Sequence, residues 1–169
     1  VKDYETSDSR VNFGQVVQAG IVMTDDKLKI KSIFSALNKI GENSRMILPL
    51  HPRTMKVIES FNIDTSNIEL IEPLGYLEMT WMISNCKKIL TDSGGLQKEA
   101  FFFSKPSIIL REETEWTELV NNNFNVLVGS NKIKIIDAFE SHVFNSNYEM
   151  DLYGGSQISK KIISIMKEY

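Results

Sequence analysis

The chain has 169 residues, a formal net charge of −3 and a sequence pI of about 5.5. This charge argues against a sequence-independent nucleic-acid binder, which would carry a basic face. Cys86 is the only cysteine, which excludes an intrachain disulfide and a cysteine metal cluster, and no apolar run approaches the roughly 18 residues of a membrane span. His51 and His142 lack the spacing of a helical metal pair, so we expect no metal site. These features predict one cytoplasmic domain that contacts neither nucleic acid nor membrane.

We expect a poorly defined N-terminal segment, residues 1–24, followed by a single folded domain, residues 25–169. The first dozen residues are polar and predict little fixed structure. The first β-like pairs are Val16-Val17 and Ile21-Val22, and Ala19-Gly20 is expected to interrupt them.

A helix is predicted from Asp26 to Ile40, where apolar residues recur at helical spacing. Asp25 or Asp26 can cap its start, and Gly41 stands where a C-terminal cap is expected. Beyond it, short apolar runs of strand length alternate with amphipathic segments of helix length. The predicted strands are 46–50, 68–71, 88–91, 107–110 and 125–128, and the predicted helices are 53–61, 77–85, 96–103, 113–121, 131–141 and 157–169.

This alternation predicts an α/β fold, a Rossmann-like parallel sheet with helices on both faces. The strands are nearly continuous apolar runs, as expected when both faces of a sheet are covered. Ligands bind beyond the carboxyl ends of the strands in such sheets. That rule selects the loops after Leu50, Ile71 and Leu90.

The loop after Leu90 is the strongest candidate for a ligand-binding loop, because Ser93, Gly94 and Gly95 connect the strand directly to a helix. Glycines let an anion approach the backbone closely, and the N–H groups and dipole of a new helix favour negative charge. Glu99 lies one turn further on the face of Gly95 and can accept two hydrogen bonds from vicinal hydroxyls, as on a ribose. An ordinary Gly-Gly turn capped by Ser93 is an equal alternative.

Three other loops contain weaker candidates for ligand binding. His51 and Arg53 stand at the mouth of the expected crevice, where an arginine can pair with phosphate. Tyr76 or Met79 can pack on the face of a base. Arg111 opens an acidic segment that ends at Trp116 and is a candidate anion ligand. The alternatives are surface or packing roles for all of these residues.

Taken together, these loops resemble the non-hydrolysing UDP-N-acetylglucosamine 2-epimerase family. The motifs that carry the resemblance are LPLHPRT (48–54), EPLGYLEMTWMISNCKKILTDSGGLQKEAFFFSKP (72–106), LREETEW (110–116), NVLVG (125–129) and DLYGGSQISKKI (151–162). The resemblance implies one half of a GT-B-type two-domain enzyme, with a UDP-sugar in the cleft between the domains and no cofactor. It also implies that Ser93, Gly94 and Gly95 bind the diphosphate, that Glu99 holds the ribose hydroxyls, and that His51 lies on the nucleotide side of the cleft.

The resemblance further implies that the catalytic carboxylates belong to an N-terminal domain that this chain lacks. The family's histidine-bearing loop before the first helix is replaced here by Ala-Gly-Ile-Val-Met at 19–23, and Trp116 stands where many members have an arginine. The Glu-Trp form resembles a subset that includes enzymes acting on UDP-diacetamido-uronic acids. We therefore expect an epimerase domain that is inactive alone and works with its missing N-terminal domain. The alternatives are the donor-binding half of a GT-B glycosyltransferase and a degenerate, non-catalytic module; a homodimer stays open.

Overall fold

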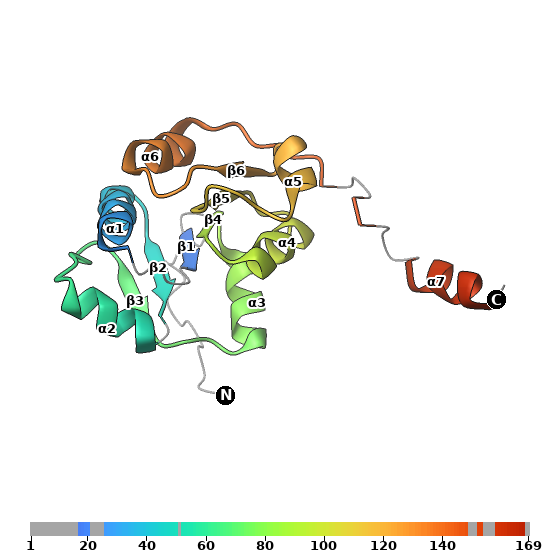
Figure 1. The fold of residues 1–169 in the computed structure, drawn as a ribbon, viewed down its shortest axis with the longest axis horizontal. Coiled ribbons are helices and arrows are strands. Elements are labelled where there is room, and N and C mark those ends of the chain that lie inside the picture. The colour runs from blue at the N-terminus through green and yellow to red at the C-terminus, as the bar shows by residue number, and fades with distance from the viewer. Residues whose placement is uncertain (1–16, 21–25, 51, 149–151, 154–157, 168–169) are drawn as a thin grey trace, which may run out of the picture.

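A single parallel sheet organises the protein (Figure 1). The structure, a computed structural model, describes residues 17–20, 26–50, 52–148, 152–153 and 158–167. The described strands run in the order β3-β2-β1-β4-β5-β6, and every neighbouring pair is parallel. The strands are β1 (Val17–Gly20), β2 (Met46–Pro49), β3 (Glu69–Ile71), β4 (Lys88–Thr91), β5 (Ser107–Ile109) and β6 (Asn125–Leu127).

Helices cover both faces of the sheet, which confirms the Rossmann-like α/β prediction. They are α1 (Lys27–Gly41), α2 (Pro52–Ser60), α3 (Tyr76–Asn85), α4 (Gly94–Phe102), α5 (Thr117–Asn121), α6 (Lys132–Ser141) and α7 (Ile158–Lys167). One apolar core joins α1, α2 and α6 to the sheet, and a second joins α3 and α4 to its other face. No helix in the described part is long and apolar enough to cross a membrane.

The strand order reverses direction between β1 and β4. The chain proceeds outward from β1 to β3 on one side and from β4 to β6 on the other. The carboxyl ends of β1 and β4 therefore lie side by side, with Gly20 in register with Thr91. This reversal is the place where doubly wound sheets hold ligands.

The predicted interruption at Ala19-Gly20 is wrong, because both residues belong to β1. They pair with Leu90 and Thr91 of β4, so backbone hydrogen bonding in the middle of the sheet outweighs the low strand propensity of glycine. This strand lies within the segment 1–24 and belongs to the same sheet as the rest of the domain.

The start of α1 is as predicted, but Gly41 is not its cap. The Asp26 carboxylate accepts hydrogen bonds from the N–H groups of Leu28 and Lys29, at 2.9 and 3.2 Å. Gly41 is the last residue of α1, and Glu42 follows as the cap residue in right-handed helical conformation.

Position 41 requires a glycine because another segment of the chain crosses it closely. A Cβ at this position would lie 2.1 Å from the carbonyl oxygen of Asn67. The Asn67 N–H donates to Asn38 Oδ1 at 3.0 Å, and its Nδ2 donates to the Asn38 carbonyl at 3.3 Å. The loop before β3 is thus held against α1 with no room for a side chain.

We expect Gly41→Ala to lower the free energy of unfolding by about 1–3 kcal/mol, the usual cost of overpacking, because the added methyl group meets backbone rather than a flexible side chain. Urea denaturation measures this change. Ser35→Ala, at an exposed position of the same helix, is the control and should stay within about 0.5 kcal/mol of the parent. Equal effects of the two substitutions would contradict the close approach.

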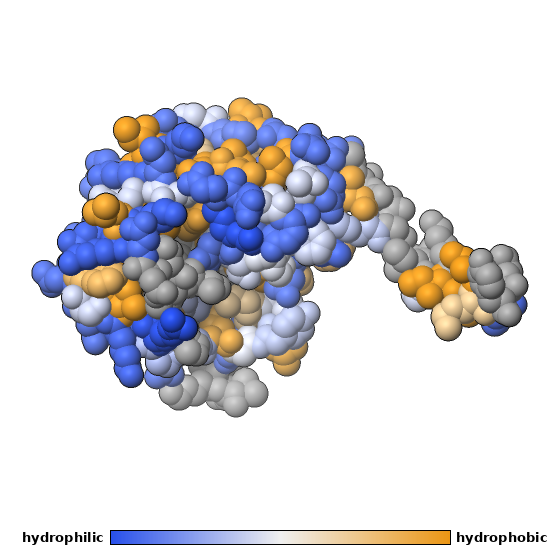
Figure 2. Space-filling model, in the orientation of Figure 1, coloured by the Kyte–Doolittle hydropathy of each residue, from blue (hydrophilic) through white to orange (hydrophobic). Residues whose placement is uncertain are grey.

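The terminal helix is also confirmed, and it projects away from the sheet in Figure 1. Its large apolar residues are exposed and gather on the surface in Figure 2; they are Ile162, Ile163, Ile165 and Met166. An amphipathic helix is stable in water chiefly when its apolar face is packed.

Candidate functional site

The candidate site is the turn between β4 and α4. Ile89, Leu90 and Thr91 are completely buried, and only two residues lie between the end of β4 and the start of α4. Ser93 is the N-cap residue: its Oγ accepts a hydrogen bond from the Leu96 N–H at 3.5 Å, and its own N–H donates to Thr91 Oγ1 at 3.0 Å. The capping role uses an acceptor lone pair of the Ser93 hydroxyl and leaves its proton free to be donated.

The two glycines of the turn face different surroundings. A Cβ on Gly95 would meet no atom within 4 Å, and Gly95 is exposed. A Cβ on Gly94 would lie 2.9 Å from Glu115 Oε1. Gly95 therefore opens the helix start to solvent, whereas Gly94 accommodates another part of the protein. Glu99, half-buried, lies one turn beyond Gly95 on the same side of α4.

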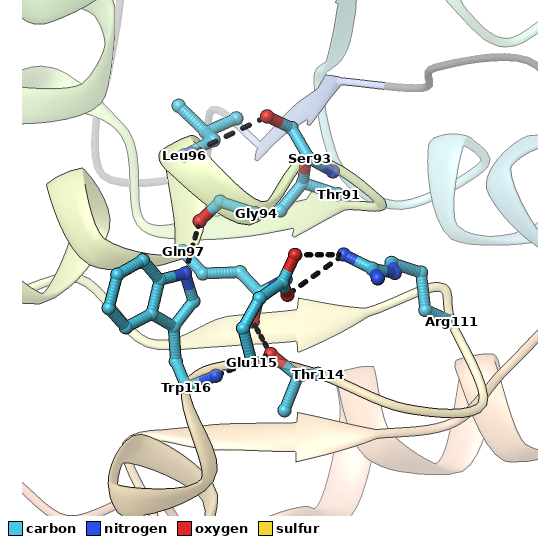
Figure 3. A network of polar contacts seen from close by, with 9 residues as sticks. All are labelled: Thr91, Ser93, Gly94, Leu96, Gln97, Arg111, Thr114, Glu115 and Trp116. Carbon is cyan, nitrogen blue, oxygen red and sulfur yellow. Dashed lines mark hydrogen bonds and ion pairs between the residues drawn. The ribbon is translucent and has the colours of Figure 1, made fainter.

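Residues Arg111–Trp116, which we call the strap, cross over the start of α4 (Figure 3). The Thr114 hydroxyl donates to Gln97 Oε1 at 2.6 Å, and Gln97 is completely buried. The Trp116 indole Nε1–H donates to the Gly94 carbonyl at 2.7 Å. The strap is thus bonded to α4 at two points three residues apart, on one face of the helix.

The predicted helix 113–121 is too long, because α5 begins only at Thr117. The Thr114 hydroxyl accepts the N–H of Trp116 at 3.1 Å while it donates to Gln97. A threonine side chain that bonds nearby backbone competes with helix formation. The tertiary contact with Gln97 decides that competition, so residues 113–116 form a loop.

Arg111 pairs with a carboxylate of the strap itself. Its Nη1 lies 3.1 and 3.0 Å from Glu115 Oε1 and Oε2. A hydrogen bond from its own backbone, followed by the Arg111 side chain, holds the pKa of Glu115 below its ordinary value. Glu115 also lies beside Gly94, so the carboxylate of this ion pair is next to the turn.

An aromatic cluster supports the strap from behind. Tyr153 meets the Trp116 ring edge-on, with ring centroids 6.1 Å apart at 87°. The cluster contains Phe101, Leu119 and Phe124, with Trp116, Tyr148, Leu152 and Tyr153 packed against them. The Tyr148 hydroxyl is buried with no hydrogen-bond partner among the described residues, and burial raises the pKa of Tyr148 to about 12.

The other candidate residues follow neighbouring strands at the same edge of the sheet. Arg53 is exposed in the first turn of α2, and Tyr76, the first residue of α3, is 73% exposed. Met79 is half-buried against the core under α3. His51 lies outside the described residues.

In the part of the chain that the structure describes, no three His, Cys, Asp or Glu side chains are grouped so that they could hold a metal ion. Cys86 is buried, and burial raises the pKa of its thiol to about 11. A thiol in that environment stays protonated at neutral pH and is a poor nucleophile.

The fold and the turn define a Rossmann-like domain in which a helix begins, behind a glycine turn, at the topological switch point of the sheet. Residues 22–167 match the family model described as UDP-N-acetylglucosamine 2-epimerase, and the chain belongs to that family.

Two relatives show how much of a family member the chain represents. It is 45% identical over 141 residues to UDP-2,3-diacetamido-2,3-dideoxy-D-glucuronate 2-epimerase of Pseudomonas aeruginosa, and 36% identical over 149 residues to UDP-N-acetylglucosamine 2-epimerase of Methanocaldococcus jannaschii. These matches cover 82% and 84% of this chain but 40% and 41% of the relatives. The chain therefore spans about two-fifths of their length.

Solved structures agree in fold. The UDP-GlcNAc 2-epimerase from Methanocaldococcus jannaschii superposes with a TM-score of 0.78 at 32% identity, over 92% of this chain and 46% of that one. The same enzyme in complex with UDP-GlcNAc and UDP gives a TM-score of 0.75, over 91% and 45% of the two chains.

Sequence patterns did not reveal the contacts between the strap and α4. Positions 94 and 116, and 97 and 114, are far apart in the sequence, and no periodicity relates them. One feature of the sequence could have indicated these contacts. Thr114 and Trp116 are hydrogen-bond donors that lie among the glutamates of residues 112–115.

We expect Glu115→Gln to tighten the binding of inorganic pyrophosphate about two- to fivefold, because it removes a negative charge beside the Gly94-Gly95 turn. Isothermal titration at low salt measures the affinity. Glu113→Gln, an exposed carboxylate on the same strap, is the matched control and should change the affinity less. Weaker binding to the Glu115 variant would show that this carboxylate does not oppose the anion.

Tyr148→Phe is expected to flatten the alkaline pH dependence of stability. A phenol whose pKa is raised on folding stabilises the protein fully below its ordinary value near 10, and this contribution is lost as the pH rises towards 12. Phenylalanine keeps the ring contacts with Phe101 and Phe124 and does not titrate.

Denaturant unfolding between pH 9 and pH 12 measures this difference against the parent chain. Tyr76→Phe is the control, because its ring is largely exposed. If Tyr148→Phe and the parent lose stability in parallel across this range, the burial of the Tyr148 hydroxyl is not the cause.

Proposed function

We propose that this chain is the UDP-binding domain of a two-domain UDP-N-acetylglucosamine 2-epimerase. The single observation that carries the proposal is the helix start at Gly94-Gly95. It combines an exposed glycine, an N-cap hydroxyl and a position at the topological switch point. Membership of the family and the complex of the Methanocaldococcus jannaschii enzyme with UDP-GlcNAc and UDP support the choice of ligand.

In this proposal, different residues bind the diphosphate, the ribose and the uracil of UDP. The Ser93 hydroxyl and the N–H groups of Gly94 and Gly95 bind the diphosphate, which the positive end of the α4 dipole favours. Glu99 accepts hydrogen bonds from the two ribose hydroxyls. Arg53, from the first turn of α2, and His51 are further ligands of the nucleotide, and Tyr76 or Met79 packs on the uracil.

Epimerisation proceeds in this proposal by elimination and re-addition. Removal of the proton at C2 of the sugar accompanies breakage of the C1–O bond, which releases UDP and leaves a 2-acetamidoglucal. UDP then adds back at C1, and a proton is delivered to the opposite face of C2. This domain contributes by stabilising the negative charge that develops on the diphosphate as it leaves, which is the function of preorganised N–H donors.

The acid and base groups belong to a second domain in this proposal. The chain spans about two-fifths of its relatives, and the exposed apolar face of α7 offers a surface for a further part of the protein. This chain supplies only one side of the cleft between the two domains. It therefore binds UDP but lacks half of the contacts to the transition state.

Two assays test the proposal. Isothermal titration of the chain with UDP should detect binding, and incubation of the chain alone with UDP-N-acetylglucosamine should give no manno epimer. The same incubation with the two-domain protein should give the epimer, and UDP-2,3-diacetamido-2,3-dideoxy-D-glucuronate is the comparison substrate. Failure of the two-domain protein to bind UDP would overturn the proposal.

Gly95→Ala separates binding from folding. The added methyl group meets no protein atom, and alanine is favoured over glycine in a helix by up to about 1 kcal/mol, so stability should be unchanged or higher. The same methyl group obstructs the approach of a diphosphate to the backbone, so UDP affinity should fall about tenfold or more. Unchanged UDP affinity would exclude the turn as the diphosphate site.

A further inference from the structure

The indole of Trp116 is hydrogen-bonded to one peptide group in the turn. Its Nε1–H donates to the Gly94 carbonyl at 2.7 Å (Figure 3). The Gly94 carbonyl and the Gly95 N–H belong to the same planar trans peptide group and point in opposite directions. A bond that holds the carbonyl therefore also aims the N–H.

The Gly95 N–H is one of the donors that the helix itself leaves unused. Ser93 is the N-cap of α4, so the N–H groups of Gly94, Gly95 and Leu96 have no partner within the helix. The Ser93 hydroxyl accepts the N–H of Leu96. No other acceptor for the Gly94 and Gly95 N–H groups is found among the described residues, so both groups can bind a ligand.

Trp116 is itself held firmly. Lys98 Nζ lies 4.6 Å from the centroid of its ring, and Tyr153 packs edge-on against it. The neighbouring Thr114–Gln97 hydrogen bond fixes the backbone of the strap. The indole N–H thus points in one defined direction. Trp116 contacts a face of α4 that is different from the face that carries Gly95 and Glu99.

We infer that Trp116 is a positioning residue for diphosphate binding, which acts by holding the Gly94 carbonyl so that the Gly95 N–H points at the anion. This inference rests on the proposed function. A hydrogen bond to the carbonyl also polarises the peptide group and makes its N–H a stronger donor. The indole supplies this bond without adding charge to the site.

Trp116→Phe tests the inference, because it keeps an aromatic ring in the cluster and removes the donor. We expect UDP affinity to fall about three- to tenfold, the range that one neutral hydrogen bond supplies. The affinity for uridine, which lacks the diphosphate, should be unchanged. In the free protein the amide resonance of Gly95 should shift, because its peptide group has lost a hydrogen bond at the carbonyl.

Two further variants keep the result interpretable. Trp81→Phe makes the same chemical change at an exposed position on α3 and should alter neither affinity nor the Gly95 resonance. If Trp116→Phe fails to fold, β-(3-benzothienyl)alanine at position 116 replaces the N–H with sulfur in a ring of nearly the same shape.

The outcomes separate this inference from the proposed function. A parent chain and two-domain protein that both fail to bind UDP overturn the proposed function and this inference with it. A parent that binds UDP, with a Trp116 variant that binds UDP equally well, overturns only the role of the indole. Equal losses for UDP and uridine would assign Trp116 a general structural role instead.

Discussion

Parallel pairing of β4 with a strand on each side is the constraint on which the site depends. β1 and β5 flank it, and the residues of β4 from Ile89 to Thr91 are fully buried. The Leu110 N–H donates to the Thr91 carbonyl at 2.9 Å, at the last position of the strand. β4 cannot shift its register without losing its backbone hydrogen bonds to both β1 and β5. The start of the helix that follows it therefore has a fixed position.

Helix α4 carries its contacts with the strap and its proposed ligand-binding residues on different faces. One face carries Gly94, Gln97, Lys98 and Phe101, which contact the strap and the aromatic cluster. Gly95 and Glu99 lie on another face of the helix. Preorganised donors are effective because their orientation costs nothing when the ligand arrives. In the proposed function, the strap supplies that orientation through its hydrogen bonds to the Gly94 carbonyl and to Gln97.

The predictions that failed share a physical cause. Gly41 has the local pattern of a helix cap, but its size is set by the loop at Asn67. Ala19-Gly20 has the pattern of an interruption, but pairing with Leu90 and Thr91 of β4 holds it in the sheet. Residues 113–116 have the pattern of a helix start, but Thr114 bonds to Gln97. A contact with a distant segment overrides the local preference in each case, and such contacts leave no periodic signal.

The sequence by itself determined the alternation of strands and helices, the parallel sheet, an aspartate cap at position 25 or 26 and the glycine turn after β4. These features depend on hydrophobic period, capping and backbone freedom, which are properties of neighbouring residues. Only the tertiary structure decided that Arg111 pairs with Glu115 and that the Trp116 indole bonds to the Gly94 carbonyl. The reason is that packing of the strap on α4 brings together residues whose spacing along the chain contains no information about their distance in space.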